Sequence, residues 1–381
     1  MERQRVAAID LLRGLVMIIM ALDHTRDYFS NYQYDPLDLG HADGPMFFTR
    51  WITHYCAPLF VFLSGTSAFL SLGRGRTRKQ ASLLLLTRGL WLIILELTII
   101  RFGWMFNLDY SLVVVQVIWA IGWSMVFLSL LVFLNRMYIG AIAVLIISGH
   151  NLLDGIHAGD FGGVWWHIAH ELGSVSYGEN NTFVVLYPLV PWIGVMAAGY
   201  CFGSLLTVEE QKRNKLLYWT GGGAIVLFIV LRLSNIYGDP SPWVKGPGLV
   251  SFLSFLNTTK YPPSLLYLLM TLGPAIMLMP LLEGWKGRLS KITAVFGRVP
   301  LFYYILHIYL IHGLALAGGL LLGFPASQFT DNGFSFNSNG WGFDLPVVYG
   351  VWVLAVVLLY FPCSWFMGVK AARRKWWLSY L

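Results

Sequence analysis

The chain has 381 residues, of which 57% are hydrophobic and only 12% are charged, whereas soluble domains carry roughly 25% charged residues. This composition excludes an ordinary soluble protein and indicates a polytopic membrane protein. The net charge of +7 comes from basic residues clustered in the loops between apolar segments, so we expect no nucleic-acid partner. Cys56, Cys201 and Cys363 lie far apart in apolar segments and predict no disulfide.

Hydropathy predicts an all-α, polytopic transmembrane helical bundle with about ten spans near the ~20-residue length that crosses a bilayer. We expect one domain covering residues 1–381. Asp10 and Arg13 interrupt the first apolar run and no small-x-small cleavage site follows, so a retained first helix is expected. The spans are 9–29, 51–72, 81–101, 111–134, 137–153, 183–206, 215–236, 263–283, 292–323 and 345–367.

Lysine and arginine set the expected orientation. Counted from a cytoplasmic N-terminus, the basic clusters share one side and most acidic residues lie in the opposite loops. Both termini are therefore expected in the cytoplasm, and the protein in the inner cell membrane. The longest outer loops could form a rim over a cavity; they are 30–50, 154–182, 237–262 and 324–344.

The first span carries six ionisable residues, one of them a histidine. Asp23, Arg26 and Asp27 share a helix face. A carboxylate three residues from His24 could hold one ring nitrogen and leave the other to act as a base. A polar helix end capped by its own ion pairs is the alternative, although it leaves the histidine unexplained.

Two more candidate catalytic residues, Asp35 and His54, lie near the same outer surface. Asp35 follows the first span, and His54 lies near the start of the second. Either residue alone would be an ordinary loop or interface residue. Their position beside His24 makes a shared site a hypothesis.

The ninth span contains a polar stripe. Tyr303 and His307 are four residues apart and share a face, whereas His312 points elsewhere. Arg298 lies near the cytoplasmic end, with a kink expected at Pro300. Such a stripe is typical of a water-filled tunnel, and hydrogen bonding between helices is the alternative.

In the third span, Arg88 and Glu96 lie eight residues apart, or ~12 Å along a helix, which is too far for direct pairing. Each needs a partner on another helix or water in a cavity. Arg88 could bind an anion or make a structural pair. The His167-x-x-His170 spacing in the outer loop lacks a clear further ligand, and we expect no metal.

Three stretches carry a resemblance to a known family. They are Asp10-x-x-Arg13-Gly14, then Asp23-His24-x-Arg26-Asp27, then 50–58. They resemble a bacterial family of membrane proteins that is similar to the catalytic domain of lysosomal heparan-α-glucosaminide N-acetyltransferase. The stretch 297–307 is similar to the late helix of that family.

The resemblance implies a transmembrane acyltransferase. Such an enzyme takes acetyl-CoA from the cytoplasmic side and acetylates an amine or hydroxyl of a sugar or glycoconjugate on the far side. The lysosomal enzyme has an asparagine where this chain places His24. Its proposed catalytic histidine lies in the following outer loop, near Asp35 or His41 here, so the identity of the base stays open.

The sequence therefore predicts acetyl transfer through the membrane. Arg13, Arg88 and Arg298 would hold the phosphates of acetyl-CoA, because arginine suits bidentate phosphate contacts, and Tyr303 would line the same path. His24, oriented by Asp27, would deprotonate the acceptor.

His307 or Tyr303 would help to stabilise the oxyanion. The expected partners are acetyl-CoA, a sugar or glycoconjugate acceptor and the lipid bilayer, while a homodimer is left open. The alternative function is a proton-coupled transporter or flippase of a polar or lipid-linked substrate.

Overall fold

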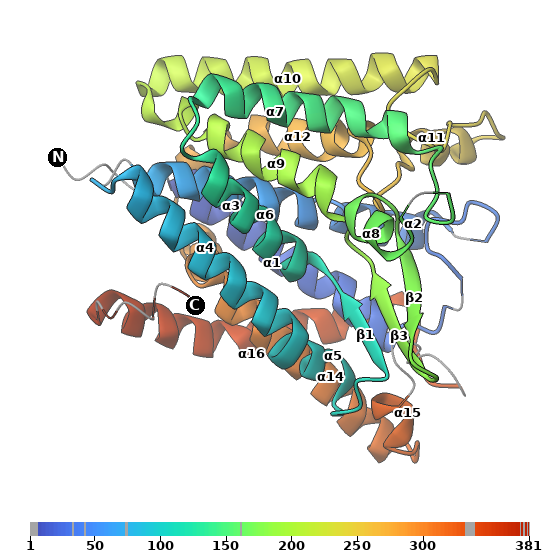
Figure 1. The fold of residues 1–381 in the computed structure, drawn as a ribbon. Coiled ribbons are helices and arrows are strands. Elements are labelled where there is room, and N and C mark those ends of the chain that lie inside the picture. The colour runs from blue at the N-terminus through green and yellow to red at the C-terminus, as the bar shows by residue number, and fades with distance from the viewer. Residues whose placement is uncertain are drawn as a thin grey trace. The chain divides into compact units, whose positions relative to one another are not determined.

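The computed structural model describes residues 7–32, 34–41, 43–72, 75–160, 162–331, 340–373, 375, 378 and 380. The chain is built mostly of helices (Figure 1). Its elements group into two compact units, each assembled from separate stretches of sequence. The described residues of the first unit fall in Met1–Cys56, Thr98–Asp109 and Leu282–Leu381, and those of the second in Ala57–Leu97 and Tyr110–Leu281.

The first unit is organised around its N-terminal helix, α1, which packs against α13, α14 and α16. Gly14 and Gly297 make the α1–α13 crossing close. A Cβ atom on Gly14 would overlap the carbonyl oxygen of Thr293, and one on Gly297 would overlap that of Asp10. Small residues therefore let these two backbones touch. The helices of this unit are α1 (Ala7–Phe29), α2 (Gly44–Thr53), α5 (Arg101–Met105), α13 (Arg288–Arg298), α14 (Pro300–Leu321), α15 (Ser327–Thr330) and α16 (Leu345–Ala372).

The second unit contains two tight helix pairs, α4 with α6 and α7 with α9. Gly89 on α4 and Gly122 on α6 meet at the first crossing, where a Cβ atom on either would press on the carbonyl oxygen of the other. The helices that lie wholly in this unit are α4 (Arg78–Leu95), α6 (Val117–Leu131), α7 (Arg136–Gly149), η2 (His150–Leu153), α8 (Val164–Ala169), α9 (Leu189–Phe202), η3 (Leu205–Thr207), α10 (Glu210–Ser234) and α11 (Leu249–Leu256). Three helices include residues of both units, namely α3 (Cys56–Leu72), η1 (Glu96–Ile100) and α12 (Leu265–Gly284).

The second unit also holds a three-stranded sheet in the order β1-β3-β2, made of β1 (Leu112–Val115), β2 (Gly173–Tyr177) and β3 (Asn181–Val185). β1 runs parallel to β3 and β2 antiparallel to it. The chain is mostly helical, as expected, and this small sheet is the part that the all-α prediction missed. The spans expected at 111–134 and 183–206 begin as strands, because short β-branched apolar runs satisfy a hydropathy window as well as a helix does.

Eight helices in the described part of the chain are long and apolar enough to cross a membrane, which identifies a helical membrane protein. They are Gly44–Leu72, Arg78–Met105, Arg136–Leu153, Leu189–Thr207, Glu210–Ser234, Leu265–Gly284, Pro300–Leu321 and Leu345–Ala372. The other two expected spans correspond to α1, which carries five Asp and Arg residues, and to α6, which has only 15 residues. The total of ten spans and the cytoplasmic termini remain predictions.

The expected ninth span, 292–323, is two helices rather than one kinked helix. Val299 separates α13 from α14 with φ −130° and ψ 51°, and Pro300 is the first residue of α14. Proline disfavours helical geometry in the residue before it and suits the first position of a new helix.

Candidate active site

Two predicted site residues, His24 on α1 and His307 on α14, meet within the first unit. The Nδ1 atom of His24 lies 2.7 Å from the Nε2 atom of His307, and the two rings stack at a centroid distance of 4.8 Å. His307 is fully buried, whereas His24 is half-buried. Of the two imidazoles, that of His24 is therefore the one that a substrate can approach.

The contacts of His307 assign the protons of the pair. Its Nδ1 atom lies 3.2 Å from the carbonyl oxygen of Tyr303. A carbonyl only accepts, so this nitrogen carries the hydrogen and the Nε2 atom is the acceptor. His24 must then donate from Nδ1, which places its basic lone pair on Nε2. This is the arrangement of an oriented general base.

Aromatic side chains fix the position of His24. The ring of Trp104, from α5, packs against the imidazole in a T-shaped arrangement with a centroid distance of 4.8 Å. The hydroxyl of Tyr28 donates to the carbonyl oxygen of Trp104 at 2.9 Å, and the two rings stack. Sequence reasoning missed Trp104 and Tyr28, because a tryptophan in an apolar segment carries no signal of its own.

A half-buried cluster of ion pairs lies beside His24 and consists of Asp23, Arg26, Asp27 and Arg50. Asp23 accepts from Arg50 at 2.8 and 2.6 Å, and it also pairs with Arg26 at 2.9 Å. Asp27 pairs with the same Arg26 atom at 2.6 Å. The expectation that Asp27 orients His24 is therefore wrong. The neighbouring guanidinium, which is always charged, takes the carboxylate, and His307 takes the imidazole.

The two other predicted catalytic residues, Asp35 and His54, make hydrogen bonds to residues close to them in sequence. Asp35 is exposed in the loop after α1, where its Oδ1 atom accepts the N–H of Leu37 at 2.9 Å. His54 is fully buried at the end of α2, and its backbone N–H donates to Trp51. Their participation in catalysis stays a prediction.

Two of the residues predicted to bind acetyl-CoA lie near the α1–α13 crossing. Arg13 donates to the carbonyl oxygen of Gly297 at 3.3 Å. The Nε atom of Arg298 lies 3.5 Å from the Oδ2 atom of Asp10, and the arginine side chain is 45% exposed. Arg298 can therefore reach an anion, which would compete with Asp10 for the guanidinium.

Tyr303 packs against His307. Its side chain is fully buried and stacks on His307 at a centroid distance of 5.5 Å. Both side chains are fully buried, whereas that of His24 is partly exposed. The expected contact of Tyr303 with the cofactor, and the oxyanion role of either residue, stay predictions. Arg88 lies in the second unit, on α4.

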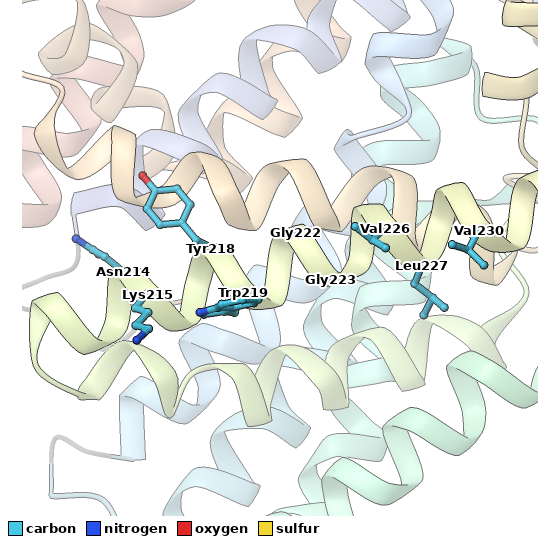
Figure 2. A pocket seen from close by; sticks show the side chains of 9 residues that line it. All are labelled: Asn214, Lys215, Tyr218, Trp219, Gly222, Gly223, Val226, Leu227 and Val230. Carbon is cyan, nitrogen blue, oxygen red and sulfur yellow. The ribbon is translucent and has the colours of Figure 1, made fainter.

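An open groove follows one face of α10 (Figure 2). Its apolar residues, such as Val226 and Val230, are exposed, as on a helix that contacts lipid. The lining contains none of the predicted site residues and suggests no chemistry. It comprises Asn214, Lys215, Tyr218, Trp219, Gly222, Gly223, Val226, Leu227 and Val230.

Fold and site together define a helical membrane protein with a hydrogen-bonded pair of histidines beside a cluster of ion pairs. Residues 5–234 match the heparan-alpha-glucosaminide N-acetyltransferase catalytic family, and the chain belongs to this family. A comparison with curated proteins gives no match. The matched region includes His24, Asp23 and Arg50, whereas His307 and Arg298 lie outside it.

Proposed function

We propose that this protein transfers an acetyl group from cytoplasmic acetyl-CoA to an amine or hydroxyl of a sugar or glycoconjugate on the outer side of the membrane. Membership of the family supports a membrane acetyltransferase. The observation that carries the site is the hydrogen bond between His24 and His307. It gives a partly accessible imidazole a fixed orientation and a defined basic nitrogen.

In the proposed reaction, the Nε2 atom of His24 accepts the proton of the acceptor amine or hydroxyl. The acceptor atom attacks the thioester carbonyl of acetyl-CoA and forms the new C–N or C–O bond. The C–S bond breaks, and the departing thiolate takes the proton from His24. General base catalysis of this kind contributes typically 10²–10⁴-fold to a rate, here roughly the share that His24 would supply.

His307 acts by position in this scheme. While His24 is protonated, its Nδ1–H group still donates to the Nε2 atom of His307, so the ring does not rotate during the proton transfer. The donation of His307 to the carbonyl oxygen of Tyr303 keeps that acceptor nitrogen in place. Asp23 and Arg50 hold α1 and α2 together beside the base.

The donor would bind through arginines. Arg298 is the best-placed residue of the first unit, because its guanidinium is partly exposed and a phosphate could replace the Asp10 carboxylate as its partner. Arg13, on the helix that Arg298 faces, would add a second positive charge. Arg88 stays a prediction from the sequence.

Binding of acetyl-CoA to purified protein in detergent, measured by calorimetry, tests the donor. We expect saturable binding that weakens at least about tenfold in Arg298→Ala, because a bidentate phosphate contact is lost. Arg288→Ala, an exposed arginine of the same helix, should bind like the native protein. Absence of binding in folded protein would contradict the proposal and favour transport of a polar or lipid-linked substrate.

A further inference from the structure

A second group of histidines lies in the second unit, where the end of α7 meets α8. His150 and His170 are each only 2% exposed, and Asp154 lies beside them with a side chain that is 18% exposed. Burying polar groups costs free energy unless they are paired or bind a metal. The buried histidines and the carboxylate are therefore expected to have partners.

Two of the distances between the donor atoms approach the spacing in a tetrahedral metal site. The Nδ1 atom of His150 lies 3.3 Å from the Nε2 atom of His170, which in turn lies 3.7 Å from the Oδ1 atom of Asp154. A tetrahedral zinc ion with bonds of about 2.0–2.1 Å holds its ligand atoms about 3.3 Å apart. One ligand atom from each of the three residues already lies within 4.8 Å of the others.

Neighbouring groups hold these ligands in place. Asn151 donates to the Oδ2 atom of Asp154 at 2.8 Å, and the Oδ1 atom of Asn151 accepts the N–H of Leu265 at 2.9 Å. The ring of His170 stacks on Trp166, whose Nε1–H group donates to a backbone carbonyl. Such supporting contacts are typical of metal ligands.

The same cluster has an alternative without metal. The Nε2 atom of His170 also lies 2.9 Å from the carbonyl oxygen of His150. A hydrogen on this nitrogen would donate to that carbonyl, whereas a lone pair on it could bind a cation. The Nε2 atom of His170 cannot carry a hydrogen and bind a metal ion at the same time. A metal-binding experiment therefore distinguishes the two possibilities.

We propose that His150, Asp154 and His170 form a binding site for a divalent transition-metal ion of the zinc type. Two imidazoles and one carboxylate are a ligand set used by zinc, with a water molecule completing the fourth position. The ion would join the end of α7 to α8. This departs from the expectation of no metal, and it does not depend on the proposed acetyl transfer.

The test uses full-length protein purified with a non-histidine affinity tag, stripped with a chelator and titrated with Zn²⁺. We expect about one tightly bound ion per chain, and Asp154→Asn should weaken binding at least about tenfold while preserving side-chain size. Co²⁺ in place of Zn²⁺ should give the visible absorption of a four-coordinate site. Thermal unfolding should shift upward with Zn²⁺ in the native protein and not in Asp154→Asn.

His157→Gln is the matched control. His157 lies three residues from Asp154, but its side chain is 66% exposed and pairs with Glu171. We expect its zinc affinity to equal that of the native protein. Failure of the stripped native protein to bind Zn²⁺ would overturn the proposal, as would equal affinity in Asp154→Asn. If Asp154→Asn does not fold, His150→Gln provides the same comparison.

Discussion

The Nδ1 atom of His24 lies 2.7 Å from the Nε2 atom of His307, although 283 residues separate the two in sequence. The contact forms because α1 packs along both α13 and α14, with glycines at the α1–α13 crossing. In the proposed mechanism this contact makes His24 the base and His307 the residue that orients it. The predictions below test this relationship and the structure that supports it.

Loss of His307 should slow the reaction without weakening the binding of acetyl-CoA. In His307→Ala we expect kcat to fall by about 100-fold, because misplacement of a catalytic group by 1 Å can cost that much, while KM for acetyl-CoA stays unchanged. His307→Gln should recover part of the rate, since its side-chain oxygen can accept from His24. Steady-state kinetics on variants with native-like unfolding temperatures check this. Equal rates in His307→Ala and the native protein would contradict it.

The ion-pair cluster predicts that Asp23→Ala lowers the free energy of unfolding more than Arg50→Ala does. Asp23→Ala leaves Arg26 and Arg50 without the carboxylate between them and should destabilise the protein by about 3 kcal/mol. Arg50→Ala leaves the Asp23–Arg26 pair intact and should cost about 2 kcal/mol, as is typical of a lost hydrogen bond to a charged group. Thermal unfolding in detergent measures both. The interpretation fails if Arg50→Ala is the more damaging change.

The close α1–α13 crossing predicts that adding one methyl group at Gly297 destabilises the protein. Gly297→Ala would drive a Cβ atom into the carbonyl oxygen of Asp10, and overpacking of this kind typically costs 1–3 kcal/mol. Gly313→Ala on α14 is the control, because nothing lies within 4 Å of its added Cβ atom. We expect a lower unfolding temperature for the first variant and no loss for the second. Identical behaviour would exclude a tight crossing.

The Asp38 carboxyl in the loop after α1 predicts a small dependence of protein stability on pH in the acid range. The N–H of Gly40, at 2.9 Å, and then the ring of His41, at 2.6 Å, lower the pKa of the exposed Asp38 carboxyl. A lowered pKa in the folded state adds stability above the unfolded pKa of about 3.9, and that stability is lost as the pH falls through the folded value. The advantage of native protein over Asp38→Asn in thermal unfolding should therefore shrink below about pH 4. A difference that grows with acid would show the opposite sign.

Much of the helical structure could be predicted from the sequence. Apolar runs of about 20 residues locate helices reliably, and every expected span contains one. Helical spacing placed Asp23, Arg26 and Asp27 on one face, and both acids pair with Arg26, as in the alternative of a helix end capped by its own ion pairs. These features depend on residues a few positions apart.

Features that depend on long-range packing could not be predicted. The choice of His307 over Asp27 as partner of His24 is set by where α14 lies against α1, which no local spacing records. The strand Leu112–Val115 finds its partner about 70 residues later in β3, a distance that hydropathy cannot bridge. The cluster of His150 and His170 likewise forms only when α7 and α8 meet.

The most direct test of the central claim is release of CoA by purified protein reconstituted in vesicles with acetyl-CoA and an amino sugar. His24→Ala is compared with His157→Ala, which changes an exposed loop histidine, after calorimetry has shown that both bind acetyl-CoA. We predict acceptor-dependent CoA release in the native protein and in His157→Ala, and a loss of at least about 100-fold in His24→Ala. Full activity in folded His24→Ala would contradict the proposed role of the histidine pair.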